Sequence, residues 1–175
     1  MATKKTSMFT LTERLTLAAG ATPTASATID LGSYVDVGDR QALQIHSVDF
    51  ISQGATASDA INGSMPTNSA VLTQVTDLNR GGLVFANDRA LVASQALRID
   101  GQGGYSMEAD LYPDNFGKGS DDGRYVVNDQ LYLEATCTGT TTAALNVTVR
   151  VNASIVSLSA KDFMAIAIQS TAADN

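Results

Sequence analysis

Apolar and polar residues alternate along several segments of the chain. Residues 144–158 show this most clearly: the odd positions from Leu145 to Ile155 are apolar, and the even positions between them are polar. Residues 9–17 alternate in the same way, with Glu13 as the exception at an apolar phase. A period of two puts successive side chains on opposite faces of a strand, so both segments are predicted strands with one buried face.

Weaker versions of this pattern predict further strands. They cover residues 25–31, 42–52, 70–78, 105–112 and 125–137, and the last of these is a strand pair or one bent strand. The apolar run 91–99 suits either a strand or a short helix. Loops of very unequal length separate these segments.

Residues 42–52 carry apolar side chains at both phases of the alternation. Leu43, Ile45 and Ile51 share one predicted face, whereas Val48 and Phe50 share the other with His46. We therefore expect this strand to be buried on both sides, or to present one face to an interface.

The C-terminal segment departs from the strand pattern. Ser159 and Asp162 have the spacing of a helix-capping box, and an apolar run over 163–168 follows. A short C-terminal helix and a final strand are the two alternatives. We expect one domain over residues 1–175, with a short flexible segment at 1–7 and a tail at 170–175.

Composition favours strands over helices. The chain has three Glu and four Lys among 175 residues, although these residues normally fill the exposed faces of helices. Thr, Ser, Asp and Asn supply most of the polar positions, and they suit strands, turns and caps. Together with the absence of a strand–helix alternation, this predicts an all-β fold, either a β-sandwich or a barrel.

Charge and cysteine content exclude several classes of protein. The net charge of −7 argues against strong direct binding of nucleic acid. One Cys excludes an internal disulfide framework, and one His and one Cys exclude a Cys/His zinc cluster. No apolar run approaches about 18 residues, so no transmembrane segment is expected, and the N-terminus is a poor match to a signal peptide.

Candidate catalytic residues are few. His46 is the one possible histidine base, but it lies within a predicted strand, and no nucleophile elbow motif accompanies it. Cys137 ends a predicted strand and is interpreted as a buried thiol. We expect no enzymatic activity and no catalytic or cofactor-binding residues.

Acidic residues gather around one long loop, 113–123. Asp114, Asp121 and Asp122 are the candidate ligands for Ca²⁺, although their spacing is not that of an EF-hand. A solvated acidic turn is the alternative interpretation. No cofactor is expected apart from this Ca²⁺ at an interface between subunits.

The chain resembles single jelly-roll capsid proteins of small icosahedral viruses over most of its length. The resemblance rests on the whole layout of strands and on three segments: the Asp-Leu-Tyr-Pro-Asp sequence at 110–114, the Tyr-Val-Val-Asn-Asp-Gln-Leu-Tyr-Leu sequence at 125–133, and the long final strand before the segment 159–169. It implies a single antiparallel β-sandwich, an eight-stranded jelly roll. It also implies a virion protein of the capsid shell that self-assembles with copies of itself in a symmetric homo-oligomer.

One feature departs from many such capsid proteins, because the chain lacks an Arg-rich N-terminal arm. The resemblance then implies that a second capsid protein or a membrane lies against the genome, or that the charge of this subunit does not drive packaging. A minor or spike virion protein is a variant of this hypothesis.

A β-sandwich binding module, carbohydrate-binding or adhesin-like, is the alternative function. Sugar-binding sites present aromatic side chains, and most aromatic residues of the second half are candidates for that role. They are Tyr105, Tyr112, Phe116, Tyr125 and Tyr132.

Overall fold

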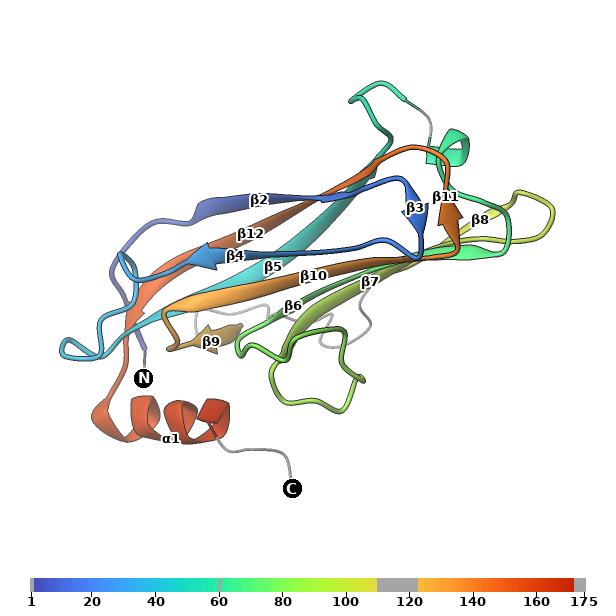
Figure 1. Cartoon of the computed structure of the whole chain (residues 1–175). Coiled ribbons are helices and arrows are strands. Elements are labelled where there is room, and N and C mark those ends of the chain that lie inside the picture. The colour runs from blue at the N-terminus through green and yellow to red at the C-terminus, as the bar shows by residue number, and fades with distance from the viewer. Residues whose placement is uncertain (1, 60, 110–122, 172–175) are drawn as a thin grey trace.

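The computed structural model describes residues 2–59, 61–109 and 123–171, which form strands followed by one C-terminal helix (Figure 1). In chain order the strands are β1 (Thr3–Lys4), β2 (Phe9–Leu17), β3 (Gly20–Ala21), β4 (Thr24–Asp30), β5 (Gln41–Gln53), β6 (Ser69–Thr76), β7 (Leu91–Ile99), β8 (Tyr105–Ala109), β9 (Arg124–Val126), β10 (Gln130–Thr138), β11 (Thr140–Thr141) and β12 (Leu145–Ser157). A 3₁₀ turn, η1 (Ile61–Gly63), lies between β5 and β6, and the helix is α1 (Ala160–Thr171).

The strands form two five-stranded antiparallel sheets and a small ribbon. In the first sheet β12 pairs with β5, β5 pairs with β9, and the other side of β12 pairs with both β1 and β2. The second sheet runs β4-β10-β6-β7-β8, and β3 pairs with β11. Figure 1 shows the two sheets as layers of one sandwich, with α1 beside β9.

This strand order is that of a jelly roll. Eight strands make up the pattern: β2, β4, β5, β6, β7, β9, β10 and β12. Among them the first lies beside the last, β2 with β12, and the second lies beside the one before last, β4 with β10. Such wrapping of the two halves of the chain is the double Greek key. The predicted antiparallel sandwich is confirmed, and β8 extends the second sheet beyond the eight strands.

The main core lies between the sheets and contains the inward residues of the predicted alternation. Leu15 and Leu17 of β2, Leu131 and Leu133 of β10, and the odd positions of β12 from Leu145 to Ala153 are all buried there. A fully buried aliphatic side chain contributes roughly 1.5–3 kcal/mol by leaving water, so this core supplies the main stabilisation of the sandwich.

A β-bulge in β5 corrects the predicted faces of that strand. Asn152 lies opposite Ser47 and Ala153 lies opposite Ile45, so His46 between them has no partner in the register. The extra residue reverses the phase of the alternation. Leu43 and Ile45 before the bulge, and Val48 and Phe50 after it, therefore all pack against the main core, whereas Ile51 is 37% exposed on the outer face.

Two ambiguous segments are also resolved. Residues 91–99 form the strand β7, which pairs with β6 on one side and with β8 on the other. Residues 125–137 form parts of two strands rather than one bent strand, because β9 belongs to the first sheet and β10 to the second. Part of the predicted strand 105–112 lies outside the described residues.

The C-terminal segment is a helix. The Ser159 hydroxyl oxygen accepts a hydrogen bond from the backbone N–H of Asp162 at 3.2 Å and donates one to its carboxylate at 2.8 Å, so the predicted cap is present. Phe163 buries its side chain in a second apolar cluster, with Ala42, Val156 and others. The helix therefore covers the outer face of the first sheet at one end.

Near the termini, part of segment 1–7 is ordered as β1, which pairs with Val156 and Ser157 of β12. The predicted tail 170–175 begins within α1, and its residues 172–175 lie outside the described part of the chain.

Candidate functional site

The predicted Ca²⁺ ligands Asp114, Asp121 and Asp122 lie outside the described residues, as do Tyr112 and Phe116. Within residues 2–59, 61–109 and 123–171, no group of three or more His, Cys, Asp or Glu side chains is placed to hold a metal ion. Asp129, which follows the acidic loop, is exposed, and its backbone oxygen accepts a 2.7 Å hydrogen bond from the Leu31 N–H.

His46 contacts a serine hydroxyl of the neighbouring strand within the first sheet. The Nε2 atom lies 2.8 Å from the Oγ atom of Ser154 across the bulge. Ser154 is completely buried, so its hydroxyl is closed to a substrate in this conformation. Burial, assisted by nearby Lys4, lowers the pKa of His46 below its ordinary value. A neutral imidazole bonded to Ser154 thus ties the unpaired bulge residue to β12.

Cys137 lies on the inward face of β10 and is completely buried in the main core. Burial raises the pKa of its thiol, which favours the unreactive protonated form. The side chain behaves as a small apolar residue of the core.

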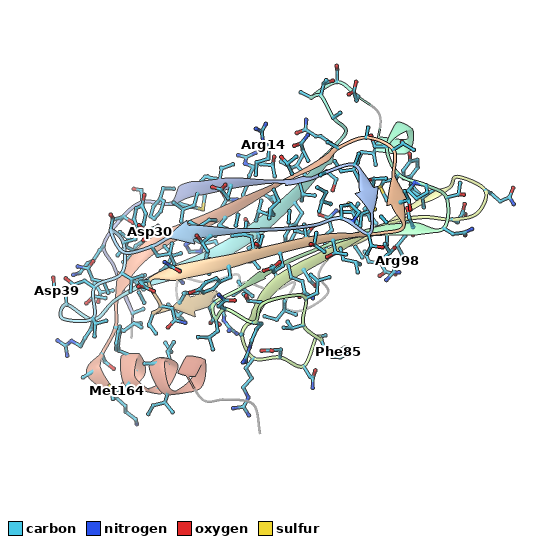
Figure 2. All side chains as sticks on the ribbon, viewed as in Figure 1. Arg14, Asp30, Asp39, Phe85, Arg98 and Met164 are labelled. Atoms are coloured by element: carbon cyan, nitrogen blue, oxygen red, sulfur yellow. The ribbon has the colours of Figure 1, made fainter. Side chains whose placement is uncertain are left out.

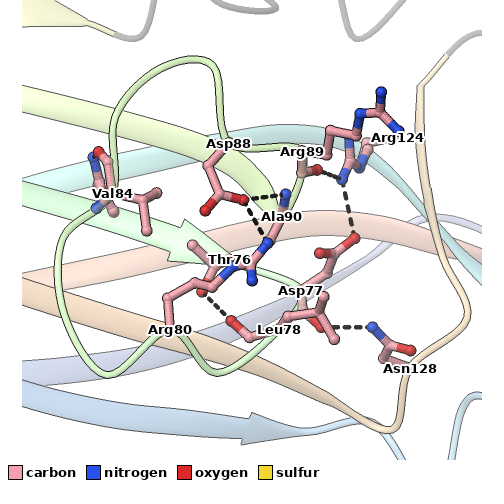
Figure 3. A network of polar contacts seen from close by, with 11 residues as sticks. Thr76, Asp77, Leu78, Arg80, Val84, Asp88, Arg89, Ala90, Arg124 and Asn128 are labelled. Atoms are coloured by element: carbon pink, nitrogen blue, oxygen red, sulfur yellow. Dashed lines mark hydrogen bonds and ion pairs between the residues drawn. The ribbon is translucent and has the colours of Figure 1, made fainter. Parts of the chain in front are cut away.

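A polar network that the sequence pattern does not indicate joins the two sheets beyond the end of β6 (Figure 3). The carboxylate of Asp77 accepts a hydrogen bond at 3.0 Å from Arg124, the first residue of β9. The backbone oxygen of Asp77 accepts a 2.6 Å bond from the Asn128 amide, and Arg124 also donates to the Arg89 carbonyl. Asp77 and Arg124 lie far apart in the sequence, so periodicity offers no signal for this contact.

The loop between β6 and β7 folds back over the outer face of the second sheet. Gln74, on that face of β6, holds it through two bonds, donating to the Val84 carbonyl at 2.8 Å and accepting from the Val84 N–H at 2.7 Å. Arg80 forms an ion pair with Asp88 at 3.0 Å (Figure 3). The Asn79 side chain accepts a hydrogen bond from the Gly81 N–H. These contacts hold the β6–β7 loop in place over the outer face of the second sheet.

A groove of about 570 Å³ lies between the β6–β7 loop and the outer face of β4 and β10. Its lining is mostly polar and is made of Thr24, Ser26, Ala27, Thr28, Asn79, Gly81, Tyr132 and Glu134. In the register of the sheet Thr28 lies opposite Tyr132, and Ser26 lies opposite Glu134. Burial raises the pKa of the Glu134 carboxyl, because its surroundings are poorer in water than the open surface.

Large apolar side chains are exposed around the periphery of the sandwich. Phe85 on the β6–β7 loop is 87% exposed, and Met164 lies on the outer side of α1 (Figure 2). The other exposed large apolar residues are Met8, Val37, Ile51, Tyr105, Met107 and Ile168. Apart from Ile51, they lie before β2, in the β4–β5 loop, on the edge strand β8 and on α1.

The outer face of the first sheet is polar where β2 pairs with β12. Thr10 donates to the Asn152 side chain at 2.7 Å, and Thr16 donates to the Asn146 side chain at 2.8 Å. These short polar side chains bond to one another across the two strands and make this part of the surface hydrophilic.

None of the helices in the described part of the chain is long and apolar enough to cross a membrane. No protein-family model matches the sequence, and no curated protein matches it either.

Proposed function

We propose that this protein is a structural virion protein, a capsid subunit that assembles with copies of itself into a symmetric shell. The jelly roll is an architecture that viral capsid domains use, but lectins and cupins use it as well. Since fold alone does not assign function, the proposal depends on where the surface can make contacts.

The observation that carries the proposal is the exposure of large apolar side chains on a loop, on α1 and on an edge strand. Phe85 projects from the β6–β7 loop and Met164 from α1 (Figure 2). Met107 lies on the edge strand β8. In the proposed shell these elements contact neighbouring subunits. Burial of such side chains against a partner removes apolar area from water and is therefore favourable. The low content of Lys and Glu also supports an interface, because these two residues are depleted at protein–protein interfaces.

The test is the assembly state of native material and of a surface variant. Sedimentation velocity and negative-stain microscopy should find closed, symmetric particles that contain this chain. Phe85→Ser should weaken assembly without changing the stability of the subunit, because the side chain makes little contact within it. Thr12→Ser, on the polar face of β2, is the matched control and should assemble normally.

Monomers alone, at every salt and Ca²⁺ concentration and in material from the native source, would refute the capsid proposal. Equal assembly by Phe85→Ser and the parent protein would remove the β6–β7 loop from the contact surface.

A further inference from the structure

We propose that the groove between β4, β10 and the β6–β7 loop is a binding site for a neutral carbohydrate. The inference is independent of the capsid proposal, because it depends on the surface of one subunit. It assigns the aromatic contact of the site to Tyr132.

The groove has the size and rigidity of a ligand site. Its volume of about 570 Å³ falls within the range of roughly 300–1,000 Å³ that small-molecule sites occupy. One side of the groove is the hydrogen-bonded pair β4 and β10, and the other is the β6–β7 loop, which the two bonds between Gln74 and Val84 hold in place. The site therefore needs little ordering when a ligand enters, which preserves binding free energy.

The chemistry of the lining excludes two classes of ligand. Among the described lining residues there is no Lys, Arg or His, and Glu134 carries the one ionisable carboxyl group. Arg80, between two lining residues, is paired with Asp88. An anionic ligand would therefore meet a carboxylate and no facing cation. A largely apolar ligand would leave the hydroxyls of β4 without the hydrogen bonds that water supplies.

A sugar ring matches what remains. Thr24, Ser26 and Thr28 lie at alternate positions of β4 and repeat about every 6.8 Å along the groove, which offers a row of hydroxyls to a row of sugar hydroxyls. Asn79 and Glu134 add an amide and a carboxyl, both able to bond to hydroxyl groups. The Tyr132 ring offers an apolar surface to the C–H groups of a pyranose, and its own hydroxyl stays hydrogen-bonding.

The experiment begins with the full-length chain on a glycan array that displays glucose-, galactose-, mannose- and N-acetylglucosamine-terminated oligosaccharides together with sialylated ones. Saturation-transfer NMR and calorimetry then measure affinity for the neutral oligosaccharides that bind. We expect binding of at least one neutral oligosaccharide, and weaker or no binding of its sialylated form.

Variants place the site. Tyr132→Ala should lower the affinity by about tenfold or more, because the ring contact is lost. Tyr132→Phe should keep most of it, and Glu134→Gln should reduce it. Tyr105→Ala is the matched control, since Tyr105 is an exposed tyrosine on β8, outside the groove. Circular dichroism and thermal unfolding check that each variant is folded.

Three results would overturn the inference. One is the absence of saturation transfer from every neutral oligosaccharide at millimolar concentration. Another is binding that Tyr132→Ala leaves unchanged or that Tyr105→Ala abolishes. The third is a groove that binds a polyamine or an extended peptide, measured with the same variants, and no sugar.

Discussion

Asp77 and Arg124 form an ion pair of 3.0 Å that joins the end of β6 in one sheet to the start of β9 in the other. The two partners differ in exposure: the Asp77 side chain is 3% exposed and the Arg124 side chain is 27% exposed. One oxygen of Asp77, Oδ1, has no hydrogen-bond partner within the described part of the chain. The buried carboxylate of Asp77 therefore needs the Arg124 cation to stabilise its negative charge, whereas water also reaches the Arg124 guanidinium.

This asymmetry predicts unequal effects of removing the two partners. Arg124→Met leaves a buried carboxylate without its cation and should lower the free energy of unfolding by about 3 kcal/mol. Asp77→Asn leaves a guanidinium that water still reaches, and should cost about 1 kcal/mol. Urea unfolding near neutral pH measures both values. Arg98→Met is the control and should change stability by less than about 1 kcal/mol, because its ion pair with Glu108 is exposed. A larger loss for Asp77→Asn than for Arg124→Met would contradict the argument.

The same carboxyl group predicts a dependence of stability on pH. Burial raises the pKa of Asp77 above its ordinary value, although Arg124 opposes the shift. Between the ordinary and the raised pKa the folded protein keeps a proton that the unfolded chain has lost, so this contribution to stability is present at low pH and disappears as pH rises. Relative to Asp77→Asn, the parent protein should lose stability as pH rises from about 4. Urea unfolding of both proteins across mildly acidic pH provides the comparison, and a gain with rising pH would show the shift to be downward.

Val149 tests the phase of the longest strand. It is completely buried on β12, opposite Glu13 on one side and Phe50 on the other. Val149→Asp would bury a charge next to an existing carboxyl group and should cost several kcal/mol, on the order of 4. Thr148→Asp is the matched control, since Thr148 lies on the outer face opposite Arg14 and should change stability by less than about 1 kcal/mol. Thermal unfolding measures the difference, and a stable Val149→Asp variant would mean that the faces of β12 are reversed.

Because His46 is the extra residue of the bulge, deleting it should destabilise the protein more than replacing its side chain. Deleting His46 removes the extra residue, so Leu43 and Ile45 or Val48 and Phe50 must turn away from the main core. The protein should then lose most of its stability. His46→Ala keeps the bulge and removes the contact with Ser154, at a cost of about 1–2 kcal/mol. Amide hydrogen exchange across β5 and β12 separates the two cases, and native-like protection in the deletion variant would refute the role of the bulge.

The cap of α1 predicts a local effect. Ser159→Ala removes the acceptor for the Asp162 N–H and should destabilise α1 by about 1 kcal/mol. Hydrogen exchange should increase in residues 160–168 and remain unchanged in β10, whose bonds lie in the other sheet. Exchange that rises equally in both regions would show that the helix and the sandwich unfold as one unit.

Local pattern predicted most of the strands because one buried face forces a period of two on the sequence. The alternation of β2 and β12 lies in the residues themselves, and their bounds differ by at most a few residues from the predicted segments. The cap spacing at Ser159 and Asp162 likewise indicates a helix but leaves a strand as an alternative, and the packing of Phe163 on the first sheet stabilises the helix. The apolar run of β7 has no clear period and suits either a helix or a strand. It forms a strand because it pairs with β6 on one side and β8 on the other.

The all-β class and the inward residues of the regular strands follow from local sequence pattern, and the small number of ionisable side chains follows from composition. The bulge at His46, the Asp77–Arg124 contact and the groove beside Tyr132 follow only from the way the chain folds. A period is a local property of neighbouring residues, whereas a bulge depends on the register with a partner strand. The other two features depend on which distant segments the sandwich brings together, and no local pattern records that.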